Sequence, residues 1–112
     1  MDILKYKSHQ GILIAVDCII FGFDGQQLQA LLIKRRFEPE KGKWSLMGGF
    51  VNPTESTDDA AVRILYQLTG IKNVYMEQIY CFSDVNRDSA GRVISVAYFA
   101  LINIADYSDQ LL

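Results

Sequence analysis

The chain has 112 residues, a net charge of -2 at pH 7 and a hydrophobic content of 50%. This length accommodates one domain that buries roughly 60–70% of the surface of its unfolded chain. The slightly acidic balance argues against a surface that tracks nucleic-acid phosphates. No stretch approaches the ~18 consecutive apolar residues of a membrane span, and the N-terminus lacks the apolar run of a signal peptide. We therefore expect a single cytoplasmic domain with no membrane partner.

The two cysteines, Cys18 and Cys81, each lie within an apolar run typical of a strand. Their spacing matches neither a metal-binding motif nor a disulfide framework. Free cysteine is among the residue types most often buried. We therefore expect two buried free thiols.

Residues 12–23 form a dense apolar run that ends at the turn signal Asp24-Gly25. The run is too continuous for a one-sided strand and predicts a strand buried on both faces. Residues 27–35 alternate between apolar and polar, and the short connection favours an antiparallel hairpin. Residues 36–43 are charged, contain proline and glycine, and predict a loop.

Residues 44–51 are apolar again and stop at residues 52–54, an Asn-Pro-Thr breaker. A helix is predicted to follow, because Ser56 and Asp59 have the spacing of a capping box and Gly70 suits a helix C-terminus. Apolar residues recur at helical spacing and predict a stripe that faces the core: Ala61, Ile64, Leu65 and Leu68.

Two more strands are predicted at residues 74–82 and 93–103, with a polar loop at residues 83–92 between them. The resulting order predicts an α+β fold with a mixed β-sheet. The chain ends soon after residues 105–109, which look like the approach to a helix. One face of the sheet is therefore expected to lack cover, and a second copy in a homodimer is the expected cover.

The most specific motif is a set of spaced residues around the predicted helix. Its spacing resembles the box of Nudix hydrolases, G-x5-E-x7-R-E-U-x-E-E-x-G-U, where U is a bulky aliphatic residue. The chain matches that box at Gly49, Glu55, Arg63, Leu65, Gly70 and Ile71. At its three remaining acidic positions the chain has Ile64, Gln67 and Leu68.

The missing glutamates are the groups with which Nudix hydrolases hold divalent metal against a pyrophosphate. Magnesium prefers several oxygen ligands in near-octahedral geometry. Ile64 and Leu68 offer no oxygen, and Gln67 offers one neutral carbonyl. At ~100° per residue the three positions share an arc of roughly 100°. We expect this face to merge with the core-facing stripe, leaving Glu55 as the one remaining metal-ligand candidate.

The resemblance to Nudix domains covers residues 12–103. The runs at residues 43–51, 74–78 and 92–98 are similar to the Nudix-related transcriptional regulators. In that family a catalytically degenerate Nudix domain senses a small molecule, ADP-ribose in some members and a sugar such as arabinose in others. A C-terminal winged-helix domain binds DNA, and members act as dimers.

The resemblance implies a Nudix fold in which the box helix packs on a mixed sheet. It also implies that the last helix of the fold and the DNA-binding domain lie beyond this chain. The expected organisation is an N-terminal extension at residues 1–11 and a Nudix-like domain at residues 12–112. DNA would then be bound only through the absent domain.

By the same resemblance, the ligand site is expected along the box helix, the glycine-containing strand and the loop at residues 83–92. The candidate ligand-binding residues are Arg35, Trp44, Gly48, Gly49, Glu55, Arg63, Asp84, Arg87 and Asp88. Each has a structural alternative: an ion pair for Glu55 with Arg63, close backbone packing for the glycines, core packing for the tryptophan, and solvated strand ends or turns for the others. None is assigned as catalytic.

The sequence thus supports a non-catalytic effector-binding domain that takes a sugar or an ADP-ribose-like sugar nucleotide without a cofactor. The alternative is a magnesium-dependent Nudix hydrolase that acts on ADP-ribose or another nucleoside diphosphate derivative. A scaffold with neither ligand nor turnover is a third possibility.

Overall fold

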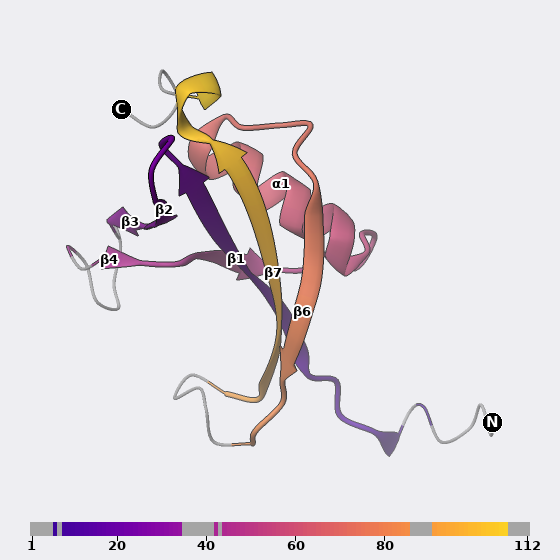
Figure 1. Ribbon diagram of the computed structural model, residues 1–112. Helices are drawn as coiled ribbons and strands as arrows, with labels where there is room; N and C mark the ends of the chain where they lie inside the picture. Colours follow the sequence, from indigo (N-terminus) through magenta and orange to yellow (C-terminus); the bar gives the residue numbers. More distant parts are fainter. Residues whose placement is uncertain (1–5, 7, 35–41, 43, 86–90, 108–112) are drawn as a thin grey trace.

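The computed structural model describes residues 6, 8–34, 42, 44–85 and 91–107, excepting the side chains at positions 33, 34, 44, 45 and 107. The regular elements follow the expected order of strands and helix, and the α+β class is confirmed (Figure 1). They are β1 (Leu13–Phe23), β2 (Leu28–Leu31), β3 (Ile33–Lys34), β4 (Trp44–Ser45), β5 (Met47–Phe50), α1 (Thr57–Thr69), β6 (Met76–Phe82), β7 (Val93–Asn103) and the 3-10 helix η2 (Ile104–Tyr107).

The main sheet is mixed and has the strand order β2-β1-β7-β6, with β5 also paired to β1. The long central strands β1 and β7 run parallel, and the other pairs in this sheet are antiparallel. The expected hairpin joins β1 to β2, with Phe23 opposite Leu28. Its turn is held by Asp24, whose carboxylate accepts the backbone N–H groups of Gln26 and Gln27, each at 2.9 Å. The strands β3 and β4 form a separate two-stranded sheet.

Both predicted ends of the helix are confirmed. The Ser56 hydroxyl accepts the backbone N–H of Asp59 at 3.0 Å, which satisfies one of the free donors of the first turn. Gly70 has the left-handed φ of 77° and donates its N–H to the carbonyl of Tyr66 at 2.8 Å. This is the conformation in which glycine ends helices at no steric cost.

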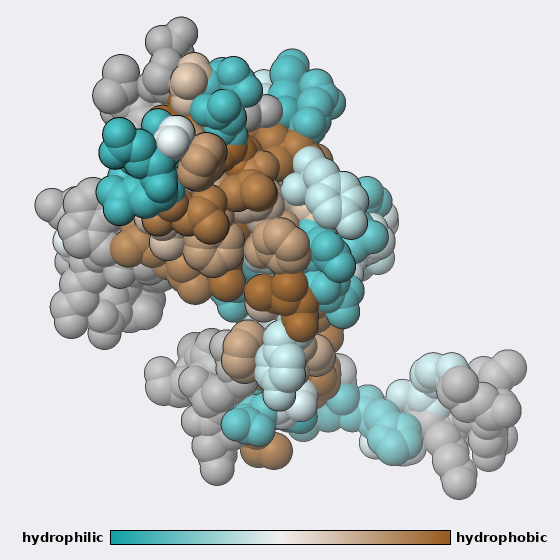
Figure 2. All heavy atoms as spheres, in the orientation of Figure 1, coloured by the Kyte–Doolittle hydropathy of each residue, from teal (hydrophilic) through white to brown (hydrophobic). Residues whose placement is uncertain are grey.

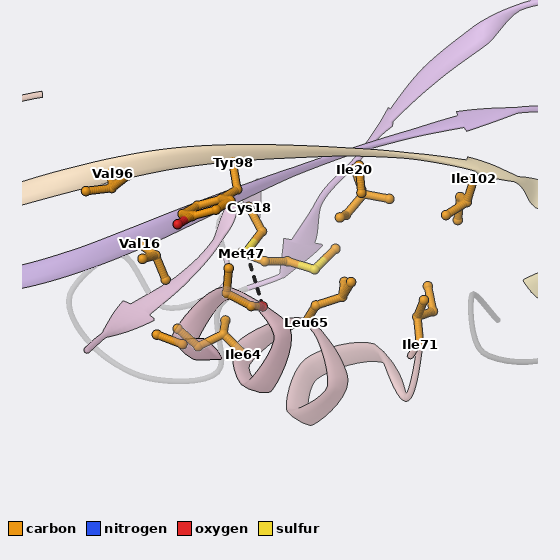
Figure 3. Close-up of a cluster of buried hydrophobic side chains, with 13 residues drawn as sticks. Val16, Cys18, Ile20, Met47, Ile64, Leu65, Ile71, Val96, Tyr98 and Ile102 are labelled. Atoms are coloured by element: carbon orange, nitrogen blue, oxygen red, sulfur yellow. Dashed lines mark hydrogen bonds between the residues drawn. The ribbon is translucent and has the colours of Figure 1, made fainter. Parts of the chain in front are cut away.

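The core lies between α1 and one face of the main sheet (Figure 3). On β1, the residues that point to the helix are buried: Val16, Cys18, Ile20 and Gly22. The alternate residues of β1 are half-buried, so the expectation of a strand fully buried on both faces is wrong in part. The physical reason is that α1 covers one face of the sheet within the described part of the chain.

The two cysteines lie in different environments. Cys18 is buried, and burial together with the neighbouring Asp17 carboxylate raises the pKa of its thiol to about 11. Cys81 is exposed, so the expectation that it is buried is wrong. It lies on β6, at the edge of the sheet, where most side chains are open to solvent.

The face of the sheet opposite α1 is rich in exposed apolar side chains. In the view of Figure 1, α1 lies behind the strands, so the opposite face of the sheet is toward the reader. Figure 2 has the same orientation and shows a broad hydrophobic surface on that face. By strand register, this surface includes the exposed residues Leu13, Phe23, Leu28, Phe50, Tyr80, Phe82 and Leu101. Contiguous apolar surfaces of this kind mark interaction sites in soluble proteins.

No helix in the described ranges combines the length and the apolar character that a bilayer span requires.

Candidate functional site

Glu55 and Arg63 join the turn after β5 to the second turn of α1. The Arg63 Nε donates to both carboxylate oxygens of Glu55, at 3.0 and 3.2 Å, and Nη2 donates to Oε1 at 2.6 Å. The same Oε1 accepts the backbone N–H of Asn52 at 2.8 Å. The Glu55 side chain is 14% exposed and that of Arg63 is 30% exposed. The structure therefore contains the ion pair that was the structural alternative for these residues.

Arg63 also reaches two other parts of the site. Its Nη2 donates to the carbonyl of Phe50 at 2.8 Å, and its Nη1 donates to the Gln67 Oε1 at 3.1 Å. Gln67, at one of the three changed acidic positions, is thus a neutral partner of the guanidinium. The guanidinium connects the end of β5, the turn and the helix, and we call this set of bonds the Arg63 bracket.

Because of the Arg63 bracket, the free energy of unfolding is expected to decrease when the pH becomes acidic. The hydrogen bonds from Arg63, followed by that from the Asn52 N–H, hold the pKa of Glu55 below its ordinary value. A carboxylate with a lowered pKa stabilises the fold above its unfolded pKa of about 4.3, and this contribution is lost as the pH falls through the folded pKa. We expect the free energy of unfolding of the wild type to fall more steeply below about pH 4 than that of Glu55→Gln.

Urea unfolding at a series of pH values from neutral to strongly acidic measures this difference. Glu77→Gln, which removes an exposed carboxylate on β6, is the matched control and should follow the wild type. Parallel curves for wild type and Glu55→Gln would show that the ion pair adds nothing to stability.

The three changed box positions do not share one environment. Ile64 is 3% exposed and belongs to the core, whereas Leu68 is 44% exposed and Gln67 is exposed. The expectation that Leu68 faces the core is therefore wrong. Helical periodicity gives the direction of a side chain but not its position along the axis, and the buried residues of α1 end at Leu65.

The side-chain oxygens at the box do not form a set of ligands for magnesium. Both Glu55 oxygens accept from Arg63, and the Gln67 oxygen does the same. Ile64 and Leu68 have no donor atoms. Among the described residues, no group of three or more His, Cys, Asp or Glu side chains could hold a metal ion. The described residues of this box therefore lack the ligand set that would hold magnesium for hydrolysis.

Gly48 and Gly49 lie on β5 and face opposite sides of the sheet. A Cβ on Gly49 would lie 2.9 Å from the Ile64 Cδ1 on the helix side. A Cβ on Gly48 would lie 2.6 Å from the Asp17 Oδ1 and 2.9 Å from the Val16 carbonyl oxygen. The close packing that was the structural alternative for the glycines is therefore present on both sides of the strand.

The space above Gly48 holds the carboxylate of Asp17, the one acid within the apolar residues of β1. Its Oδ2 accepts from the Ser95 hydroxyl on β7 at 2.7 Å, and Ser95 is buried. Sequence reasoning assigned no role to this pair. An acidic residue inside an apolar run was the available signal for Asp17, while nothing local marked Ser95 as its partner.

Tyr98 connects the sheet to the start of α1. Its side chain is 2% exposed, and its hydroxyl donates to Asp58 Oδ1 and lies 2.7 Å from the Thr57 Oγ1. Burial, and then the bond to Asp58, raise the pKa of Tyr98 above its ordinary value. Sequence reasoning missed this residue, because a tyrosine in an apolar strand shows no sign of what its hydroxyl meets.

The remaining expected site residues are not brought to the Arg63 bracket by any described contact. Arg35, Arg87 and Asp88 lie outside the described residues, and so does the side chain of Trp44. Asp84 is exposed after β6. The loop there is held by Arg92, whose Nη1 donates to the carbonyl of Ser83 at 2.9 Å.

A hollow of about 220 Å³ lies between α1 and the segment that follows it, and no residue of the Arg63 bracket lines it. It is lined by Val62, Leu65 and residues 71–74 and 76, most of which are apolar. None of the expected ligand-binding residues that the structure describes lines it. The described part of the expected site and this hollow are therefore separate features.

The comparisons with known proteins agree with the box spacing. The NUDIX domain family matches residues 11–109. An "ADPR responsive transcriptional repressor NtrR" from Acinetobacter baylyi is 42% identical over 101 residues, covering 88% of this chain and 40% of the repressor. An "ADP-ribose pyrophosphatase" from Methanocaldococcus jannaschii is 35% identical over 97 residues, covering 87% of this chain and 55% of the pyrophosphatase. This chain thus spans about half the length of these relatives.

A solved structure shows the same fold with a ligand. The NUDIX domain of NrtR from Shewanella oneidensis, crystallised in complex with ADP ribose, superposes with a TM-score of 0.77 and 32% sequence identity. The match covers 92% of this chain and 72% of that domain.

Proposed function

Because the chain belongs to the Nudix family, we propose that it is the effector-binding domain of a transcriptional regulator and that it binds ADP-ribose without hydrolysing it. The observation that carries the proposal is that the box keeps its spacing but lacks free metal-binding carboxylates among its described residues. Its spacing is intact, but Glu55 is engaged by Arg63 and Ile64 is in the core. The names of the Acinetobacter repressor and of the Shewanella domain in complex with ADP ribose support this choice of effector.

In this proposal the effector lies along β5, the turn at residues 51–56 and α1. The candidates Gly48 and Gly49 would contact the effector through backbone atoms of β5, because the space where their side chains would lie is filled by Asp17 and Ile64. Glu55 and Arg63 act by holding the turn in place. The candidates Arg35, Trp44, Asp84, Arg87 and Asp88 remain proposed contacts for the sugar or phosphate groups.

The proposal extends to assembly and setting. We propose that the chain works in the cytoplasm and forms a homodimer through the apolar sheet face opposite α1, and that DNA is bound by a separate winged-helix domain. The exposed side chains on that face support the dimer, because an apolar surface of this extent is stabilised by removal from water. A solution mass that stays monomeric at high concentration would contradict it.

Ligand binding without turnover is the test of this function. At ~100 times its Kd, a ligand adds about 2.7 kcal/mol to the free energy of unfolding. For a domain of this size that is a rise in Tm on the order of 10 °C. We expect ADP-ribose to raise the Tm in a saturable way and to be recovered intact after incubation with Mg²⁺. Arabinose, tested in parallel, is the alternative effector.

The hydrolase is the second candidate, and the similarity to the Methanocaldococcus pyrophosphatase favours it. It predicts Mg²⁺-dependent release of AMP that is lost in Glu55→Gln and retained in the matched control Glu77→Gln. Such a result would replace the sensor proposal. Unchanged melting curves with every ligand, and no AMP, would reject both candidates.

A further inference from the structure

We propose that Tyr98 is a positioning residue for effector binding, and that its hydroxyl sets the place of the first turn of α1 relative to the sheet. The proposal rests on the proposed function, because the turn before that helix is where the effector is placed. The strand β7 lies at the centre of the main sheet, between β1 and β6. A hydrogen bond from this strand therefore fixes the helix relative to the centre of the sheet.

The bonds around the Tyr98 hydroxyl have a defined direction. A tyrosine hydroxyl carries one hydrogen, and that hydrogen is donated to the Asp58 carboxylate. The Thr57 hydroxyl must therefore be the donor in its own 2.7 Å contact with the Tyr98 oxygen. Hydrogen bonds to a charged group are shorter and stronger than neutral ones. Together the two bonds hold the first two residues of α1 at one point.

The turn before α1 is consequently held at two ends. At its start, the Phe50 carbonyl accepts from Arg63 in the second turn of the helix at 2.8 Å. At the other end, the N-cap Ser56 leads directly into Thr57 and Asp58, which are bound by Tyr98. The core contacts of α1 with β1 and β5 are mostly apolar, apart from the Cys18 thiol, which donates to the Ala61 carbonyl at 3.7 Å, and the bond from Arg63 to the Phe50 carbonyl. The Tyr98 bonds add directional contacts at the helix start.

A Tyr98→Phe variant tests this with the fold kept. The ring stays in the core, while Asp58 is exposed and Thr57 is half-buried, so water can reach both after the hydroxyl is removed. The first readout is hydrogen exchange at the amides that the turn and first helical turn protect, those of Asn52, Glu55 and Ala60. We expect exchange there to accelerate about tenfold, as loss of one charge-assisted bond allows, with β1 amides unchanged.

The second readout is the Kd for ADP-ribose, measured by calorimetry at a temperature where every variant is folded. We expect it to rise about tenfold in Tyr98→Phe. Asp58→Asn, which keeps a neutral acceptor for the hydroxyl, should lie between the wild type and Tyr98→Phe, whereas Asp58→Ala should behave like Tyr98→Phe. Tyr75→Phe removes a hydroxyl from a side chain that is 76% exposed and should change neither readout.

Each outcome decides the proposal. Exchange at these amides equal to the wild type, or raised equally in β1, would overturn it, because the hydroxyl would then be dispensable or would act on global stability. If Tyr98→Phe accelerated exchange at these amides but left the Kd for ADP-ribose unchanged, the role in effector binding would also be overturned. If the wild type does not bind ADP-ribose, the proposed function fails and the effector-binding role fails with it, while the exchange data still decide whether Tyr98 fixes the helix start.

Discussion

An Ile64→Glu variant is expected to lose at least about 3 kcal/mol of its free energy of unfolding, even though it restores a glutamate that the Nudix box specifies. Ile64 is 3% exposed, and burying such a side chain contributes about 1.5–3 kcal/mol. Its replacement would also place a carboxylate in the core without a partner, which adds to the cost. Since a domain of this kind has a total stability of about 5–15 kcal/mol, this is a large fraction.

The matched control for that variant is Leu68→Glu. It introduces the same carboxylate on the same helix, at a side chain that is 44% exposed, and should change stability by less than about 1 kcal/mol. Urea unfolding followed by circular dichroism measures both variants. Equal stabilities would show that position 64 can open to solvent, and would remove the structural argument that this box cannot return to a metal-binding form.

Gly48→Ala is expected to be the second most damaging change, with a loss of about 2 kcal/mol or more. The added Cβ would lie 2.9 Å from the backbone oxygen of Val16 on the paired strand, and 2.6 Å from Asp17 Oδ1. The backbone oxygen cannot move without disturbing the pairing of β5 with β1. Space, rather than an unusual backbone angle, is therefore the requirement for glycine at this position.

Two other glycines provide the comparison. Gly49→Ala meets only the flexible end of Ile64, so its cost should be smaller and should shrink further when Ile64→Val is combined with it. Gly11→Ala meets nothing within 4 Å and should be neutral or raise stability by about 0.4–1 kcal/mol. Thermal and urea unfolding of the three variants would refute the packing argument if Gly48→Ala proved as harmless as Gly11→Ala.

The stability of Gly48→Ala must also be known before its ADP-ribose binding can be interpreted. Gly48 is proposed to contact the effector, so a loss of ADP-ribose binding in Gly48→Ala has two explanations. Measuring Kd only at temperatures where the variant is fully folded separates direct obstruction of the ligand from unfolding.

The local elements were predictable because their signals lie close together in the chain. Ser56 and Gly70 mark the ends of α1, and the Asp24 turn marks the hairpin, by interactions within a few residues. Alternation and periodicity give the class of each element for the same reason. The Glu55–Arg63 ion pair was predictable as the alternative role of two residues of the box, which lie eight positions apart in the chain.

What lies on each side of the sheet was not predictable in the same way. Cys81 was expected to be buried, because an apolar strand does not show whether it will be central or at an edge. Residues 12–23 looked like a strand buried on both faces, because apolar composition is the same whether or not a second layer covers it. The Tyr98 contact with α1 joins residues 40 positions apart in sequence, and no local pattern indicates it.

The sequence by itself determined the order of strands and helix, both ends of α1, and a box whose spacing is kept while three of its acids are replaced. Only the tertiary structure decided that Ile64 is in the core while Leu68 is exposed, that Gly48 makes room for Asp17, and that Tyr98 holds the start of the helix. The physical reason is the separation along the chain between the residues that interact. Caps, turns and periodicity arise from neighbours along the chain, whereas burial and side-chain partners depend on distant segments that meet only after folding.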